Sequence, residues 1–246
     1  MSFRPEWLDN LRTRLYHVNP PESQFSHLLV RTQIVLTSHY YRRHLPHYQP
    51  PEATFFLTFR LAGTLPSSVV EQLRLERASF AHGTASRVDS LEVKREAKRM
   101  RSYFEKFEEL LDGHTHGPLW LAIPAVAQIV FDAIRYRDGR EYRLYSACVM
   151  PNHVHLLIHV TQNNIPGRPL FRILQSLKRY TAREANNILA RSGPFWQNES
   201  YDHVVRNEEE LSQLFWYVVF NPVKAGLVGD WKEWRWTYAD PEFKAM

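Results

Sequence analysis

Residues 141–160 read EYRLYSACVMPNHVHLLIHV, and they decide the fold because two strand-like runs flank a short turn. Both runs are rich in β-branched, aromatic and aliphatic residues, a composition that is typical of strands. The intervening Met150-Pro-Asn152 is a turn signal. The sequence therefore predicts an antiparallel hairpin of strands 141–149 and 153–160.

The segments on either side of this hairpin complete one folding unit. Residues 54–61 are rich in β-branched and aromatic residues, which predicts a first strand. Apolar residues at helical spacing predict helices over 121–137 and 169–190, and a short strand is expected over 201–206. The order strand, helix, strand, strand, helix, strand is that of the ferredoxin-like split β-α-β core, an α+β fold with an antiparallel sheet.

Other segments extend or interrupt this core. Residues 1–50 are polar and aromatic with no clean period, which predicts an N-terminal extension. Residues 67–112 are densely charged and predict a helical insertion after the first strand. The main domain is then expected to span 51–236, and residues 237–246 are expected to form a C-terminal tail.

One more helix is expected near the end of the chain. Its apolar pattern covers about residues 207–219. Asn221-Pro222 follows, and proline is expected to end a helix at the residue before it. A segment rich in tryptophan comes next.

The composition excludes several classes of protein. The chain has 246 residues, of which 44% are hydrophobic and 23% are charged, so it is not intrinsically disordered. A single cysteine excludes an internal disulfide. No run approaches the roughly 18 apolar residues that span a bilayer, and the N-terminus lacks the apolar core of a signal peptide. The sequence therefore predicts a cytoplasmic protein that has no membrane partner.

Positive charge is concentrated in one helix. The whole chain carries a formal net charge of +5, and residues 167–191 alone contain six cations and one acid. A solvated helix face would normally carry interspersed acids, so this pattern favours contact with phosphates. The candidate phosphate-binding residues are Arg60, Arg172, Lys178, Arg179 and Arg183.

Three residues after this helix are candidates for contact with unpaired bases. Trp196 and Tyr201 could stack on bases, and Gln197 could read a base edge. Packing in the core is the competing interpretation for the two aromatic residues.

Two histidines are candidate metal ligands. His153 and His155 are two positions apart in a strand, so both imidazoles point to one face, while Val154 and its apolar neighbours cover the other. Neutral imidazoles can bind a divalent metal. A pair of ordinary surface histidines is the alternative.

The basic helix adds a tyrosine and a carboxylate. Tyr180 and Glu184 lie one turn apart on one helix face. Each could be structural, the tyrosine in packing and the acid in an ion pair. Together with His153 and His155, however, they suggest a metal site with Glu184 as third ligand beside a nucleophilic phenol. Such a metal can polarise a phosphate for in-line attack, which a phenol of ordinary pKa near 10 needs at neutral pH.

Several motifs, in the same order, resemble those of the REP-associated tyrosine transposases, in the single-tyrosine branch of the HUH endonuclease superfamily. The resemblance covers about residues 54–236. The motifs are MPNHVHLL at 150–157, LQSLKRYT at 174–181, FWQ at 195–197, YDH at 201–203, Tyr217, and NPVKAGL at 221–227.

The resemblance implies a metal-dependent nuclease and strand transferase. In such enzymes Mg²⁺ or Mn²⁺ is bound by the histidine pair and one helix residue. The tyrosine attacks single-stranded DNA, which leaves a 5′-phosphotyrosyl link and a free 3′-OH, and reversal rejoins the strand. By position His153 and His155 match the pair and Tyr180 the nucleophile. Glu184 occupies the place of a third ligand that is commonly an amide, and Asn187 is the substitute candidate.

The resemblance also implies the substrate and the setting. The family acts on short palindromic repeats that fold as hairpins beside a tetranucleotide, so single-stranded hairpin DNA is the expected partner and the nucleoid the expected location. A monomer and a homodimer both remain open. Two other functions also remain open: a non-catalytic hairpin-binding descendant, and a hydrolase that uses water while Tyr180 is structural.

Overall fold

The computed structural model of the chain describes residues 39–42, 46–50, 52–80, 106–107, 109–111, 117–160 and 168–243. Most of the predicted N-terminal extension lies outside these residues, as does the middle of the predicted helical insertion.

A five-stranded antiparallel sheet forms the centre of the described chain. The order of its strands is β6-β3-β5-β4-β7, so β5 lies in the middle. Four of the strands and the two helices between them form the predicted β-α-β-β-α-β unit, and the predicted α+β class is confirmed. The strands are β3 (Thr54–Arg60), β4 (Arg143–Val149), β5 (His153–His159), β6 (Tyr201–Val204) and β7 (Thr237–Ala239).

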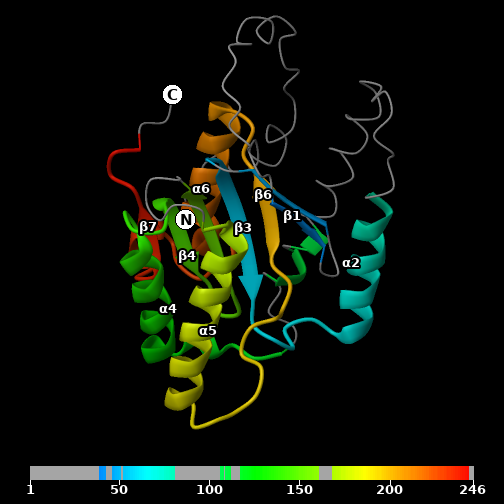
Figure 1. Cartoon of the computed structure of the whole chain (residues 1–246). Helices are drawn as coiled ribbons and strands as arrows, with labels where there is room; N and C mark the ends of the chain where they lie inside the picture. The colour runs from blue at the N-terminus through cyan, green and yellow to red at the C-terminus, as the bar shows by residue number, and fades with distance from the viewer. Residues whose placement is uncertain are drawn as a thin grey trace, which may run out of the picture.

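Two helices cover one face of this sheet. Helices α4 (Pro124–Arg137) and α5 (Leu170–Ile188) lie side by side in front of the sheet in Figure 1. Val154, Leu156 and Ile158 of β5 are buried in the apolar core beneath them. In the described part of the chain, no helix has both the length and the apolar character needed to cross a bilayer.

The other face of the sheet is covered by α6 (Glu208–Lys224), which lies behind it in Figure 1. A second core of buried residues fills this side, and it includes Phe56 of β3, Leu157 of β5 and Val218 of α6. Alternate residues of β5 therefore belong to different cores, because successive side chains of a strand point to opposite faces.

Helix α6 does not end where the sequence predicted. It continues through Pro222 to Lys224, and Gly226 with a φ of +71° follows it. Proline lacks an N–H, so only one helical hydrogen bond is lost. The last turn is closed by the N–H groups of residues 225–227, which donate to the carbonyls of residues 221–223. Asn221 is consequently part of the helix.

Three elements were not anticipated from the sequence. Strand β7 pairs with β4 and lies in the segment that was expected to be a C-terminal tail. In the predicted extension, β1 (His39–Arg42) and β2 (Pro46–Gln49) form a two-stranded antiparallel sheet.

Helix α2 (Ser67–Phe80), which was expected, stands beside the main sheet in Figure 1.

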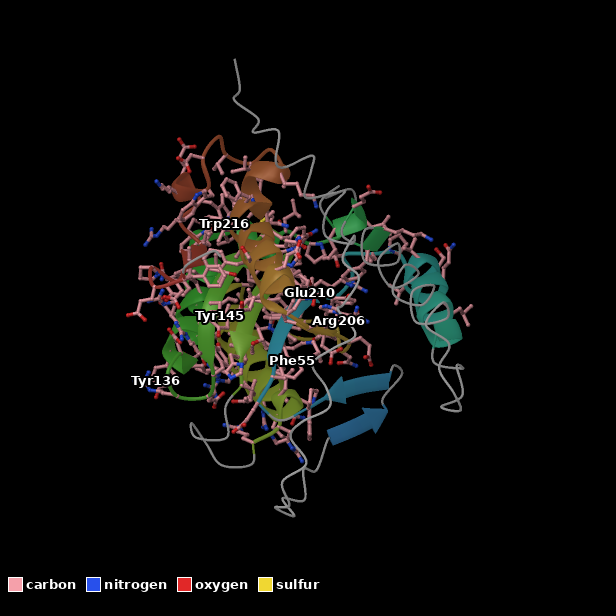
Figure 2. All side chains as sticks on the ribbon, turned by 90° about the horizontal axis from the view of Figure 1, so that it is seen from above. Phe55, Tyr136, Tyr145, Arg206, Glu210 and Trp216 are labelled. Carbon is pink, nitrogen blue, oxygen red and sulfur yellow. The ribbon has the colours of Figure 1, made fainter. Side chains whose placement is uncertain are left out.

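The start of α6 is fastened to β6 by one carboxylate. Glu210 accepts hydrogen bonds from Nε2 of His203, at 2.8 Å, and from the backbone N–H of Arg206, at 2.7 Å. Figure 2 shows Arg206 and Glu210 next to each other at this end of the helix. Burial acts to raise the pKa of Glu210, but the hydrogen bonds and charges of His203 and Arg206 outweigh it and hold the pKa below its usual value.

We predict that Glu210→Gln lowers the free energy of unfolding at pH 7 by about 1 to 2 kcal/mol, because it weakens hydrogen bonds to a charged group. A carboxylate with a depressed pKa stabilises the fold above its unfolded pKa of about 4.3 and loses that effect as the pH falls through the folded pKa. The difference from the wild type should therefore shrink below about pH 4. Urea unfolding at several pH values measures it.

Glu208→Gln is the matched control, since Glu208 is an exposed acid in the same first turn of α6. A Glu208 variant that loses as much stability as the Glu210 variant would show that charge near the helix start matters and the link to β6 does not.

Candidate active site

The two histidines of β5 lie on the sheet face that α6 covers. Both side chains are fully buried. Their rings are 4.6 Å apart between centroids, and the two Nε2 atoms are 2.9 Å apart. The prediction that both imidazoles point to one face, opposite the apolar residues of the strand, is confirmed by this arrangement.

Neighbouring side chains fix the other nitrogen of each ring. Nδ1 of His153 is 2.6 Å from Oδ1 of Asn152, and Nδ1 of His155 is 2.9 Å from Oγ1 of Thr58. Asn152 donates its amide N–H to the carbonyl of Leu111, which leaves its oxygen to accept the Nδ1 proton of His153. A neutral His153 then has its lone pair on Nε2, the atom that faces the other ring.

The short distance between the Nε2 atoms limits what can lie between the rings. Two nitrogen lone pairs repel each other at 2.9 Å unless a proton or a cation is shared between them. Imidazole nitrogens held in this way, each with its other nitrogen hydrogen-bonded, are suitable ligands for a divalent metal.

Tyr217 of α6 lies against this pair. Its ring centroid is 5.6 Å from that of His155 and 5.9 Å from that of Phe56, both in edge contacts. The side chain of Tyr217 is only partly buried. Nζ of Lys224 lies 5.2 Å from the centre of the tyrosine ring. A phenol, two imidazoles and a cation are thus gathered at one place.

Helix α6 runs toward the end of β5 that carries the histidines. Phe215, earlier in the helix, stacks on Phe243, whose ring also contacts Tyr145 near the start of β4. The start of β4 pairs with the opposite end of β5. Since Asn221 is one turn beyond Tyr217, it lies on the same helix face and closer to the histidine end.

Asn221 is fully buried, and among the described residues neither its amide oxygen nor its amide nitrogen has a hydrogen-bond partner. Burying an amide without partners costs about 1 to 3 kcal/mol. Amide oxygens are good ligands for hard divalent cations. Asn221 therefore places an amide oxygen that can bind a cation on the face of α6 that covers the histidines.

Arg60 brings a positive charge to the same face. It ends β3 and pairs in register with His153 on β5. Its guanidinium is almost completely buried and donates to Oγ1 of Thr64 at 2.8 Å. Of the residues predicted to contact phosphates, Arg60 is the one that the strand register places beside the histidines.

The expected grouping of Tyr180 and Glu184 with the histidine pair does not occur. Both residues are on α5, on the opposite face of the sheet. Tyr180 is 44% exposed, and Glu184 pairs with Arg183 at 2.7 Å. Asn187, the substitute ligand, is also on α5 and exposed. Across the described ranges, no three His, Cys, Asp or Glu side chains are grouped so that they could hold a metal.

The remaining predicted DNA contacts divide into two groups. Trp196 and Tyr201 are 6% and 8% exposed and pack in the two cores, so neither ring presents a face on which a base could stack. Lys178 donates to the carbonyls of Gln197 and Asn198 and to the hydroxyl of Ser200. Its ammonium group therefore holds this segment in place.

The arginines of α5 are exposed, and their contacts with DNA stay predictions. Arg172 and Arg179 are accessible, and Arg183 is accessible while paired with Glu184. The side chain of Gln197 lines a cavity beside the helix.

Sequence reasoning did not select Tyr217 and Asn221 as site residues. A usable signal was present: the apolar face of β5 must meet the crossover helices, so its histidine face needs a different helix. The next helix in the chain carries a tyrosine and an asparagine at four-residue spacing.

Comparisons with known proteins agree with these motifs. Residues 131–219, which include the histidine pair and Tyr217, match the family described as Transposase IS200 like. A protein of Haemophilus influenzae described as a REP-associated tyrosine transposase is 25% identical over 112 residues. That match covers 42% of this chain and 62% of the relative, so this chain spans less than two thirds of the relative's length.

A solved structure of a REP-associated tyrosine transposase bound to a REP hairpin is also similar, with 16% identity, a TM-score of 0.40 and 81% of each chain covered. The central segment of this chain matches the IS200-like transposases, and the resemblance to REP-associated tyrosine transposases that its motifs indicated is confirmed.

Proposed function

We propose that this chain is a transposase that cuts and rejoins single-stranded DNA at hairpin-forming repeats, with Tyr217 as the nucleophile. The observation that carries the proposal is the position of Tyr217, partly exposed and in contact with His155. The sequence motifs and the family match of residues 131–219 support a reaction of the transposase class. The name of the Haemophilus relative supports REP-type repeats as the target.

The reaction exchanges one phosphate ester for another. The phenol oxygen of Tyr217 attacks the scissile phosphorus and loses its proton to solvent or a nearby base. The bond from phosphorus to the 3′ oxygen breaks, and that oxygen takes up a proton to give a free 3′-OH. The 5′ side stays linked to the tyrosine. Attack by a 3′-OH on this link reverses the step and rejoins DNA without an external energy source.

Residues of this chain supply positive charge around the reacting phosphate. Lys224 lies over the ring of Tyr217, where a cation favours the negative charge that develops on the phenol oxygen. Arg60 lies beside His153, and its buried guanidinium, which donates to Thr64, adds positive charge behind this face of the sheet. Both cations are held on rigid elements, β3 and α6, which favours in-line alignment of the strand.

The donor set fits a divalent metal, Mg²⁺ or Mn²⁺. His153 and His155 would bind it through Nε2, and Asn221 through its amide oxygen in place of the carboxylate of Glu184. When bound, the metal would polarise the scissile phosphate and offset its charge. The unsatisfied amide of Asn221 and the two Nε2 atoms, 2.9 Å apart on one face, support this fit.

We predict that Tyr217→Phe lowers the formation of a covalent protein–DNA adduct by at least about a thousandfold, because it removes the nucleophilic oxygen. Tyr180→Phe should form the adduct as the wild type does. The measurement is a denaturing gel of the protein incubated with Mn²⁺ and single-stranded oligonucleotides, each with one hairpin between randomised flanks.

The two tyrosine variants test each other. An adduct that persists in Tyr217→Phe and vanishes in Tyr180→Phe would show that the nucleophile is Tyr180 of α5. Cleaved DNA without an adduct in the wild type would indicate a hydrolase that uses water. Binding without cleavage would indicate a non-catalytic DNA-binding descendant.

We further predict that Asn221→Leu raises the free energy of unfolding in metal-free buffer by about 1 to 2 kcal/mol, since it replaces a buried, unsatisfied amide with an apolar side chain of similar size. The same change should remove the additional stability that saturating Mn²⁺ gives the wild type. Urea unfolding with and without Mn²⁺ measures both effects.

Asn187→Leu is the control, because Asn187 is exposed on α5. It should change stability by less than about 0.5 kcal/mol and leave the effect of Mn²⁺ intact. A destabilised Asn221 variant that still responds to Mn²⁺ would contradict the assignment of Asn221 as a ligand.

A further inference from the structure

A cavity of about 530 Å³ lies on the sheet face opposite the histidines, between α5 and the segment that leads into β6. This volume is in the range of sites for small ligands, about 300 to 1,000 Å³. Helix α5 contributes Phe171, Gln175 and Arg179 to the lining, and the segment contributes Gln197, Glu199 and Asp202.

The cavity is preformed, because its outer wall is tied to the helix. Nζ of Lys178 reaches the carbonyls of Gln197 and Asn198 and the hydroxyl of Ser200. Nε1 of Trp196 donates to Oγ1 of Thr181 at 2.9 Å. A ligand would therefore not have to order this wall on binding, which lowers the cost of association.

The lining chemistry matches a flat ring with polar edges. Aromatic and aliphatic side chains, such as Phe171, offer an apolar wall for the ring face. Arg179 can donate to acceptor atoms on a base edge. Glu199 and Asp202 can accept hydrogen bonds from an exocyclic amino group, and both would repel a bare phosphate.

The same segment links this cavity to the candidate active site. The backbone N–H of Gln197 donates to the carbonyl of Arg60 at 2.9 Å, and Trp196 forms an isolated bridge with Leu61. Arg60 in turn pairs with His153 in the strand register. A single strand that leaves the histidine face can thus reach the cavity by passing around the end of β3.

We propose that this cavity binds one unpaired nucleobase that carries an exocyclic amino group, from the DNA strand that continues beyond the cleavage site. The proposal rests on the proposed function, because it takes single-stranded DNA as the substrate. It adds a second site that selects a base away from the reacting phosphate, with Arg179 and the two carboxylates as the groups that discriminate.

The test compares the binding of the full chain to fluorescently labelled dC10 and dU10 by anisotropy, without metal. These oligomers differ at the base in two places. Cytosine carries an amino group where uracil has a carbonyl, and N3 of cytosine accepts a hydrogen bond, as Arg179 could donate, whereas N3 of uracil donates one. We expect the wild type to bind dC10 about tenfold more tightly than dU10, which is the discrimination typical of one good base contact. Arg179→Ala should reduce this ratio to about one.

Arg183→Ala is the matched control, because it removes the same charge one turn further along α5 from a residue that does not line the cavity. It should weaken both oligomers alike and keep the ratio, as loss of a phosphate contact does. Equal binding of dC10 and dU10 by the wild type would overturn the proposal, and so would a ratio that survives Arg179→Ala or is lost in Arg183→Ala.

The two proposals fail in different ways. If the protein prefers dC10 through Arg179 but forms no adduct with hairpin DNA, the base site is supported and the transposase reaction is contradicted. If the protein forms the Tyr217 adduct but shows no preference between the oligomers, the transposase reaction is supported and the base site is contradicted.

Discussion

The alternation of side chains along β5 is the constraint on which the rest of this structure depends. Strand β5 is central in the sheet, and an apolar core covers each of its faces. Its apolar half packs beneath α4 and α5, as in any ferredoxin-like sheet. Its other half carries His153 and His155, which need polar partners once they are buried. Thr58 and Asn152 bond to the two rings and α6 covers this half, so the two halves of β5 face different helices.

Most of the core could be predicted from the sequence because its signals are local. The hairpin around Pro151, the periodic helices α4 and α5 and the paired direction of the histidines all follow from short-range patterns. Strand β7 could not be predicted, since three residues in a tryptophan-rich segment become a strand only by pairing with β4. The β1–β2 sheet likewise has no clean alternation in its sequence.

The histidine pair of the candidate site was predicted from the sequence, but its other residues were missed, for two physical reasons. First, Tyr180 and Glu184 were placed near the histidines by spacing on α5, although the apolar stripe of that helix must face the apolar side of β5. Second, proline was expected to end α6 at Asn221. With Pro222 accommodated in the last turn, Asn221 joins the helix face that carries Tyr217. The position at which α6 ends therefore determines whether Tyr217 and Asn221 share one helix face.

The buried polar groups of this site lower stability, and the surrounding packing offsets them. The unsatisfied amide of Asn221 lowers the stability of α6, whose contacts with the sheet include the Glu210 link. Each large apolar side chain that becomes fully buried contributes about 1.5 to 3 kcal/mol, and Phe56, Phe215 and Val218 all do so on this face. A cation between the imidazoles and the amide would turn the same groups from a cost into a stabilising contact. The proposed metal would therefore stabilise the site as well as supply its chemistry.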